Sequence, residues 1–195
     1  MRILFLTDNF PPEVNAPATR TYEHCVKWVE LGYQVTVITC FPNFPNGKVF
    51  EGYKNRFFKK ESIDGINVIR VWSYIAENKG FVSRIIDYIS YSFTSVIVGV
   101  FVKTDIIIAT SPQFFTAISG RLLSFFKGKP WIMEVRDLWP DSIVAVGSMS
   151  EKSKAFKILK KIERHLYLNA QKIIVVTDSF KKYLIEKHFI PSEKI

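Results

Sequence analysis

A group of charged and aromatic residues follows a short apolar run in the second half of the sequence. Four of them come directly after residues 131–135: Arg136, Asp137, Trp139 and Asp141. Opposed charges beside an aromatic ring at the carboxyl end of a strand are typical of sites that bind polyols or phosphates. The sequence therefore predicts a ligand-binding loop here, with a purely structural ion pair as the alternative.

The loop near the N-terminus carries a second set of polar side chains. No glycine precedes Gly32, whereas the dinucleotide-binding fingerprint needs glycines so that the backbone can approach the pyrophosphate closely. The sequence therefore argues against NAD or FAD, and a plain surface connector with helix caps is the alternative to a binding loop. Residues 8–20 contain three prolines and five side chains that offer hydrogen bonds or charge to a polar ligand: Asn9, Glu13, Asn15, Thr19 and Arg20.

A third loop contributes Ser111, at the start of a predicted helix. Ser111 and the first backbone amides of that helix would form a site for an anion or a hydroxyl group. In an open doubly wound sheet, ligands bind outside the carboxyl ends of the strands where the strand order reverses, usually between the first and fourth strands. We expect all three loops to meet there, and simple capping of the helix by Ser111 is the alternative.

Several other kinds of chemistry lack the residues that they need. The three histidines, His24, His165 and His188, fall within predicted helices, and no Ser-His-Asp or Cys-His arrangement follows from them. Cys25 and Cys40 have no paired spacing, so we expect two buried free thiols rather than a disulfide. No zinc-ligand spacing occurs, and no metal is predicted.

Strand and helix patterns alternate along the chain. Such alternation implies a mostly parallel sheet with right-handed crossovers, so we predict a Rossmann-like, doubly wound α/β fold. Runs rich in Ile, Val and Phe predict six strands, and helical patterns lie between most of them. The predicted strands are residues 1–7, 34–40, 67–72, 105–110, 131–135 and 172–177, and the predicted helices are residues 21–31, 83–103, 112–127, 151–170 and 179 to about 187.

The length of 195 residues predicts one domain with a sizeable core. Residues 41–65 contain two prolines, three glycines and a basic run, which predicts a long irregular excursion between the second and third strands. Residues 191–195 point toward a further strand, so we expect residues 1–195 to be one N-terminal domain followed by a second.

The charge balance of 27 basic against 18 acidic residues, +9 overall, favours an anionic partner. Nucleic acid is not expected, because no helix-turn-helix or aromatic-basic sheet signature occurs. Residues 85–102 are too interrupted by polar groups to span a bilayer; they predict a helix that covers the sheet or lies in a membrane interface. Residues 152–164 predict a helix whose basic face is either solvated or attracted to anionic lipid.

The N-terminus and the cysteine usage of the chain bear on the compartment in which it folds. The apolar run at residues 3–6 is too short for a signal peptide, and only two cysteines occur. Both features favour the reducing cytosol.

Six stretches together resemble a known family and cover nearly the whole chain: ILFLTDNFPPE (3–13), NAPATR (15–20), LGYQVTVIT (31–39), TSP (110–112), VRDLWPDS (135–142) and VTDS (176–179). By these stretches the chain resembles the N-terminal domain of family 4 retaining glycosyltransferases, which have the two-Rossmann GT-B architecture. Within that family it is similar to the WbuB-like group of cell-surface polysaccharide transferases. Two positions depart from the pattern: Asn15-Ala16 replaces a Gly-Gly pair, and Arg136-Asp137 replaces a His-Asp pair.

The resemblance implies two domains that bind different substrates. The N-terminal domain would hold the acceptor, and a C-terminal domain outside this chain would bind the nucleotide sugar, so this fragment alone is expected to be inactive. The acceptor would be a polyprenyl-diphosphate-linked glycan at the inner face of the cytoplasmic membrane, with the protein bound peripherally to anionic lipid. No metal and no cofactor apart from the nucleotide-sugar substrate follow from the resemblance.

The resemblance also assigns roles to particular residues. Arg136 and Asp137 would form the catalytic pair, the first contacting a phosphate and the second orienting an acceptor hydroxyl. The predicted acceptor-binding residues are Asn9, Glu13, Asn15, Arg20, Ser111, Trp139 and Asp141.

Two other classes of function stay open at this point. The first is a stand-alone module that binds a membrane or a partner without chemistry, which salt-dependent binding to liposomes would favour. The second is a nucleotide-dependent epimerase or dehydrogenase, which tight binding of NAD would favour and the glycine-free first loop disfavours.

Overall fold

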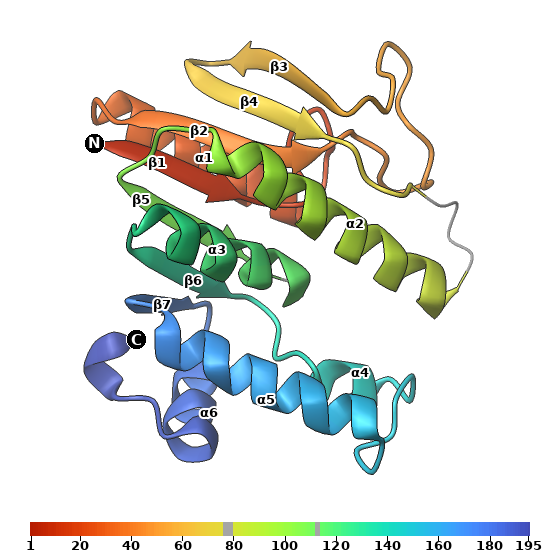
Figure 1. Ribbon diagram of the computed structural model, residues 1–195, viewed down its shortest axis with the longest axis vertical. Coiled ribbons are helices and arrows are strands. Elements are labelled where there is room, and N and C mark those ends of the chain that lie inside the picture. Colours follow the sequence, from red (N-terminus) through yellow and green to blue (C-terminus); the bar gives the residue numbers. More distant parts are fainter. Residues whose placement is uncertain (76–79, 112–113) are drawn as a thin grey trace.

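A twisted sheet of seven strands forms the centre of the part of the chain described by this computed structural model, residues 1–75, 80–111 and 114–195 (Figure 1). Six strands are parallel to one another, and the strand at one edge, β3, is antiparallel to its neighbour. The strands lie side by side in the order β3 (Phe58–Ile63), β4 (Ile66–Val71), β2 (Gln34–Cys40), β1 (Arg2–Leu6), β5 (Ile106–Thr110), β6 (Trp131–Val135) and β7 (Lys172–Val175).

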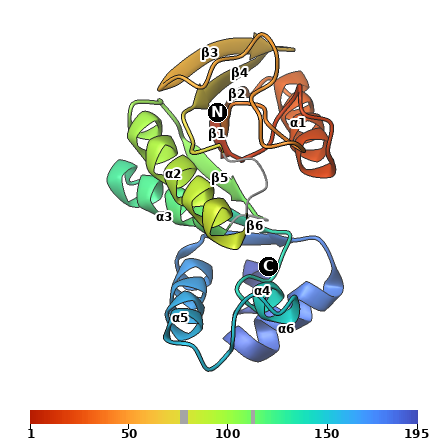
Figure 2. The same ribbon diagram turned by 90° about the vertical axis from the view of Figure 1, so that its right-hand side faces the viewer.

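Helices cover both faces of the sheet, as Figure 2 shows. Helices α2 (Phe81–Val100), α3 (Phe114–Lys127) and α5 (Lys154–Asn169) lie on one face, and α1 (Ala16–Glu30) lies on the other. Helix α6 (Asp178–His188) lies at the β7 edge of the sheet and packs against α5. The short helix α4 (Asp141–Ala145) follows β6, and a 3₁₀ turn, Ser192–Lys194, lies near the C-terminus. Local sequence sets several helix starts, because three side chains accept a hydrogen bond from a backbone amide of the first turn: Asn15, Ser153 and Thr177.

The core consists of two clusters, one on each face of the sheet. The cluster beneath α2, α3 and α5 includes Leu4, Tyr91 and Trp131, all fully buried. The cluster beneath α1 includes Phe5 and Val37, whose side chains alternate with those of the first cluster along the same strands. The parallel strands are apolar on both sides for this reason.

The predicted Rossmann-like class is confirmed, and the strand order reverses between β1 and β5, the first and fourth of the predicted strands. Two elements differ from the prediction. The excursion at residues 41–65 contains β3, which turns back into β4 through Asp64 and Gly65, both with positive φ. The loop after β6 contains α4. In the described part of the chain, no helix combines the length and apolar character needed to cross a membrane.

Candidate active site

Two arginines surround one buried carboxylate at the carboxyl ends of the central strands. Glu134, near the end of β6, is only 3% exposed, and its Oε1 lies 2.8 Å from Nη2 of Arg20 on α1. Its other oxygen, Oε2, accepts a hydrogen bond from the hydroxyl of Thr110 at the end of β5. Arg136 follows two residues after Glu134, close enough for Arg20 to lower the pKa of its guanidinium.

This group carries an excess of positive charge. Burial is the main cause of the lowered pKa of Arg136, and repulsion from Arg20 adds to it, while Glu134 acts in the opposite direction. The Nη1 atoms of Arg20 and Arg136 are both buried and have no hydrogen-bond partner among the described residues. Two neighbouring guanidinium groups, of which one pairs with the single carboxylate and both retain donors without partners, are suited to bind an anion such as a phosphate.

Ser111 fixes the backbone of the loop that carries Arg136. Its Oγ accepts hydrogen bonds from the amides of Arg136, at 2.7 Å, and Asp137, at 3.3 Å, and the residue is buried. The predicted helix-terminal amides at residues 112 and 113 lie outside the described residues. The carboxylate of Asp137 is half-buried and accepts a hydrogen bond from the hydroxyl of Ser142. Ser111, which follows β5 at the switch point, therefore holds the backbone of the predicted catalytic pair in place.

Trp139 belongs to an aromatic group beside this loop. Its ring stacks on Phe114 at the start of α3, with the centroids 6.3 Å apart and the planes 14° apart. Tyr88 of α2 and Phe115 of α3 contact the same indole edge-on. Trp139 is only partly exposed, and the group offers a rigid apolar surface next to the arginines, as sites for sugars and cofactors commonly do.

Asn9 and Asn15 stand together at the N-terminus of α1. Nδ2 of Asn15 donates to Oδ1 of Asn9 at 3.0 Å, and Oδ1 of Asn15 caps the helix by accepting from the amide of Ala18. Both side chains are partly exposed. The structure therefore brings Asn9, Asn15 and Arg20 together at the start of one helix, on the first loop.

The carboxylate of Glu13 faces the protein. Glu13 is buried, and its two oxygens accept hydrogen bonds from the amides of Phe10, Asn43 and Phe44. Burial raises the pKa of this carboxyl, although the three amide bonds oppose the shift. The sequence predicted a ligand contact here, whereas the geometry favours a structural role that ties the first loop to the segment after β2.

Asp141 is likewise engaged in an internal network. Its Oδ2 lies 2.9 Å from Nζ of Lys160 on α5 and accepts a hydrogen bond from the hydroxyl of Tyr183 on α6. Lys160 also forms a salt bridge with Glu163, at 2.6 Å, inside the same junction. This arrangement favours a role for Asp141 in joining α4, α5 and α6, in place of the predicted contact with a ligand.

Sequence reasoning missed three residues of this region. Glu134 lies within a predicted apolar strand, and a single charge in such a run is the signal of a buried ion pair. Tyr88 and Asp87 lie next to each other on α2. Asp87 is the only acidic residue of this helix and interrupts its apolar pattern, which is the signal that could have identified it. Burial raises the pKa of Asp87 to about 6, and the nearby Glu13 adds to the shift, while a hydrogen bond from Ser73 opposes it.

No group of metal-binding side chains occurs within the described residues.

Comparison with known proteins assigns the family. Residues 15–195 match the family described as a glycosyl transferase 4-like domain. The chain belongs to this family. It is also similar to a putative colanic acid biosynthesis glycosyl transferase, WcaI, of Escherichia coli strain K12, with 27% identity over 96% of this chain and 47% of that protein.

Further similarities agree with this assignment. A probable glycosyltransferase of Pseudomonas aeruginosa, WbjE, is 22% identical over 44% of this chain and 21% of its own length. Among solved structures, sucrose-phosphate synthase from Thermosynechococcus elongatus superimposes with a TM-score of 0.60 and 15% identity, over 97% of this chain and 45% of that one. The chain spans about half the length of WcaI and of this synthase. The fold is the Rossmann-like fold of GT-B glycosyltransferases, and glycosyl transfer is the general chemistry that the family indicates.

Proposed function

We propose that this glycosyl transferase 4-like domain is the acceptor-binding half of a retaining glycosyltransferase that builds cell-surface polysaccharide. Its acceptor is a glycan linked through a diphosphate to a polyprenyl lipid, at the inner face of the cytoplasmic membrane. The nucleotide sugar is bound mainly by a second domain outside residues 1–195. No metal and no cofactor other than this donor substrate takes part.

The observation that carries this proposal is the pair of arginines around Glu134. A diphosphate bridge bears negative charge, and Arg136 and Arg20 have unsatisfied donors at the carboxyl ends of the strands, where ligands of doubly wound folds bind. Because the site is partly desolvated, one guanidinium not neutralised by a carboxylate attracts an anion more strongly than a surface arginine does.

Each of the neighbouring groups has a part in this function. Arg136 contacts a phosphate of acceptor or donor, and the carboxylate of Asp137 orients the acceptor hydroxyl. The bond between the anomeric carbon and the donor phosphate breaks, the acceptor oxygen bonds to that carbon, and its proton passes to the leaving phosphate. Stabilisation of phosphate charge, rather than a protein nucleophile, lowers the barrier. The rings of Trp139 and Phe114 support a sugar beside this point.

Calorimetric titration of the 195-residue chain tests the proposal. The probes are a water-soluble short-chain prenyl diphosphate linked to N-acetylglucosamine, and the nucleotide sugars UDP- and GDP-linked hexoses. We expect the prenyl-linked probe to bind more tightly than either nucleotide sugar, and Arg136→Gln to weaken it by about tenfold, because a charge-assisted hydrogen bond is lost.

The matched control is Arg2→Gln, because Arg2 lies at the opposite, amino-terminal edge of the sheet and pairs with Asp105. This variant should bind the probe as the unmodified chain does. Tighter binding of nucleotide sugars than of the prenyl-linked probe would contradict the proposal and make this the donor half. Binding of neither ligand would favour the alternative, a module for a membrane or a partner without chemistry.

A further inference from the structure

The outer side of α2 is apolar along its whole length. Side chains at intervals of three or four residues share one side of a helix, and on a helix that covers a sheet the outer side is normally polar. Here the outward positions hold large apolar groups, of which Phe93 is 67% exposed and Phe101, just after the helix, is 83% exposed. The exposed apolar residues of this stripe are Val82, Ile86, Ile89, Phe93, Val100 and Phe101.

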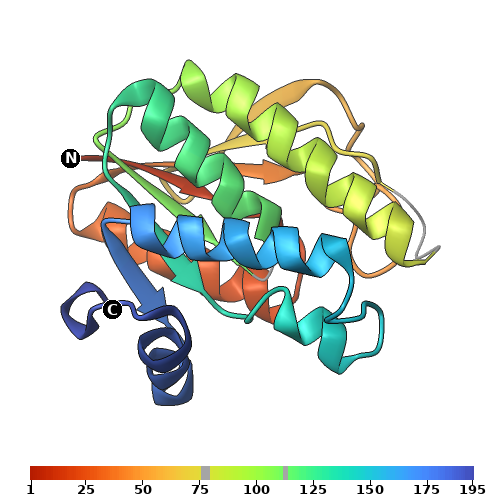
Figure 3. The same cartoon turned by 60° about the horizontal axis from the view of Figure 1, so that its bottom comes forward.

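Neighbouring elements extend this stripe into a wider surface, which we call the α2 face. Helix α3 lies beside α2, as Figure 3 shows, and Nζ of Lys127 donates to the carbonyl of Val100, so that the ends of the two helices meet. Exposed apolar side chains continue the surface on both sides of α2. They are Leu122, Phe125 and Phe126 of α3, and Phe57 and Phe58 at the start of β3.

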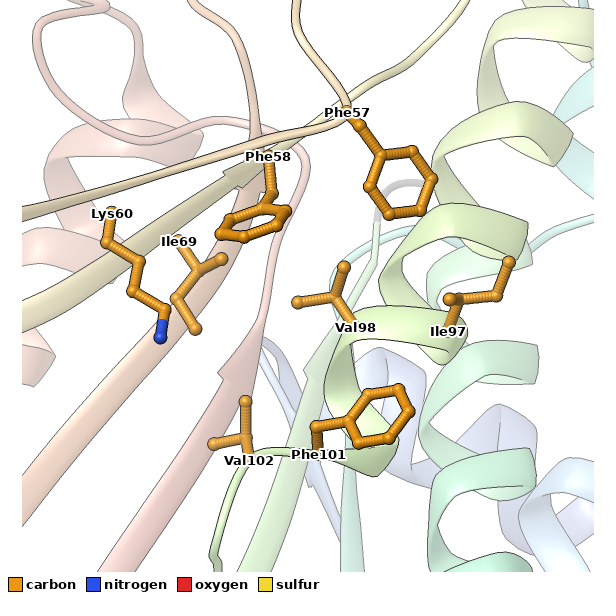
Figure 4. Close-up of a pocket in the computed structure, with 8 residues that line it drawn as sticks. All are labelled: Phe57, Phe58, Lys60, Ile69, Ile97, Val98, Phe101 and Val102. Atoms are coloured by element: carbon orange, nitrogen blue, oxygen red, sulfur yellow. The ribbon is translucent and has the colours of Figure 1, made fainter.

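A cavity of about 300 Å³ opens within the α2 face, between β3 and α2. Figure 4 shows Phe58, Val98 and Val102 turned toward the same space, with Phe101 beside it. The lining is hydrocarbon except for Lys60, whose ammonium group lies at the side. An apolar cavity with one cation at its edge is suited to a hydrocarbon chain that carries an anionic head group.

The charges around the α2 face are almost all positive. Helix α3 contains no acidic residue, and the only acidic residue of α2, Asp87, is largely buried with a raised pKa. Lys60 lies on one side of the face, and the exposed side of α5, on the same side of the sheet, is also basic. The exposed or partly exposed basic residues of these elements are Lys60, Arg84, Lys103, Arg121, Lys127, Lys129, Lys157, Lys161 and Arg164.

We infer that the α2 face docks on the surface of a bilayer that contains anionic phospholipid. A large exposed apolar surface marks an interaction site, and basic residues around it complement lipid phosphates. A second copy of this chain is a poor occupant, because it would bring an equal positive border against the first. In such docking, each inserted ring contributes the free energy of burying its apolar area, and the basic residues around the face add their attraction to the lipid phosphates.

The orientation connects this surface to the candidate active site. The first turns of α2 extend past the end of the sheet (Figure 1), and there Tyr88 contacts Trp139. A molecule docked by the α2 face therefore holds Arg136 and its neighbours beside the lipid head groups. The inference deepens the proposed function by placing the lipid-linked acceptor, and to that extent rests on it, but docking itself requires no acceptor.

Co-sedimentation of the 195-residue chain with vesicles tests the inference. The vesicles are phosphatidylcholine alone, or phosphatidylcholine mixed with phosphatidylglycerol, each at low and at raised salt. We expect binding to the mixed vesicles, weakened by salt and absent for the neutral lipid. Phe93→Ser combined with Phe101→Ser should weaken this binding at least about tenfold, because two exposed rings no longer enter the interface.

The matched control is Leu31→Ser combined with Phe189→Ser, because both side chains are exposed to a similar degree and lie at the ends of α1 and α6, away from the α2 face. This pair should bind the mixed vesicles unchanged, and circular dichroism should show all the proteins folded. Equal binding by the α2-face variant, or equal binding to neutral vesicles, would overturn the inference. A concentration-dependent dimer that the α2-face variant abolishes would also overturn it, and would assign the face to a second copy.

Failure of the inference and failure of the proposed function give different results. Binding to vesicles without affinity for the soluble prenyl-linked probe would support the docking surface and contradict the acceptor site. Affinity for the probe without binding to vesicles would support the acceptor site and contradict the docking surface.

Discussion

Arg20 and Arg136 have the same charge but are held in different ways. Arg20 is about 29% exposed and forms a salt bridge with Glu134, whereas no salt bridge joins Arg136 to a carboxylate among the described residues, and its Nη1 is buried without a hydrogen-bond partner there. Burying a charge without a partner costs free energy, which a bound anion can return. Stability and ligand binding should therefore depend on different arginines of the pair.

Substitution of each arginine by methionine should separate the two roles. Arg136→Met should leave the free energy of unfolding unchanged or raise it by about 1 kcal/mol, because no ion pair is broken and a partly buried charge is removed, while affinity for pyrophosphate falls. Arg20→Met should destabilise the chain by about 2 kcal/mol, because Glu134 stays buried without its cation. Urea denaturation gives the first quantity and calorimetry with pyrophosphate the second. Equal destabilisation by both variants would show that Arg136 is structural.

The residues of the candidate site were predictable by type but not by pairing. Arg20 and Arg136 were found because charged groups after strands and in first loops are informative. The buried carboxylate beside them was not predicted, because Glu134 lies inside a strand and its partner, Arg20, is more than a hundred residues away in sequence. In a sequence, Glu13 and Asp141 cannot be distinguished from acids that bind a ligand. Only the fold shows that a backbone amide and the ammonium group of Lys160, respectively, bind them.

At the scale of elements, α3 lies unusually close to the sheet. A methyl group added at Gly120 would lie 2.6 Å from Cβ of Ala109 on β5 and 3.1 Å from the ring of Trp131 on β6. Both neighbours belong to the core beneath the helix. Glycine at this position therefore sets the distance between α3 and the strands that carry Ser111 and Glu134.

Gly120→Ala should destabilise the chain by about 2 kcal/mol despite the higher helix propensity of alanine, because neither neighbour can move without shifting a strand. The control is Gly99→Ala on α2, where the new methyl group would meet Cδ1 of Leu123, the end of a flexible side chain. This control should cost less than half as much, as measured by the midpoint of urea denaturation. Equal costs would mean that α3 shifts freely on the sheet.

The junction of α4, α5 and α6 contains two titrating groups with opposite shifts. Burial raises the pKa of Glu163 from 4.5 to about 7, although the salt bridge with Lys160 opposes this. Burial lowers the pKa of His188 from 6.5 to about 4, and Lys160 adds to the shift. Between these values the folded state binds the proton of Glu163 more tightly than the unfolded state does, and that of His188 less tightly.

Glu163→Gln should isolate the first of these effects. Stability contributed by the protonated carboxyl is present below pH 4.5 and is lost as the pH rises through about 7. The difference in unfolding free energy, unmodified chain minus variant, should therefore fall by about 1 kcal/mol per pH unit in this window, while the His188 effect cancels. Urea denaturation at a series of pH values measures it, and the exposed Glu186→Gln on α6 serves as the control substitution. A flat difference for Glu163→Gln would mean that Lys160 keeps the carboxylate charged.

Two elements were missed in the sequence for physical reasons. Strand β3 lies at the edge of the sheet, and its exposed residues Phe58, Lys59 and Lys60 give little of the apolar pattern by which the buried strands were found. Helix α4 has only five residues, too few for a helical period to be recognised. The central strands and the switch point were predicted because burial on both faces leaves a strong signal in the sequence.

At the scale of the whole molecule, one sheet separates two core clusters, and each contains one of the two cysteines. Cys25 of α1 belongs to the cluster beneath that helix, and Cys40 at the end of β2 belongs to the cluster beneath α2. Burial raises the pKa of Cys25 to about 12 and that of Cys40 well above its usual value, so neither thiol reacts readily in the folded chain. The two thiols therefore report separately on the two sides of the sheet.

Because the same strands contribute side chains to both clusters, neither side can open without exposing the other, and we expect unfolding in a single cooperative step. Pulsed thiol labelling along a urea series, with each cysteine followed by mass spectrometry, should give one midpoint for both thiols. Circular dichroism should give the same midpoint. Chains with Cys25→Ala or Cys40→Ala provide the control for assigning each labelled site. Labelling of Cys25 at lower urea than Cys40 would instead show that α1, with Arg20 and the first loop, opens independently of the sheet face that α2 covers.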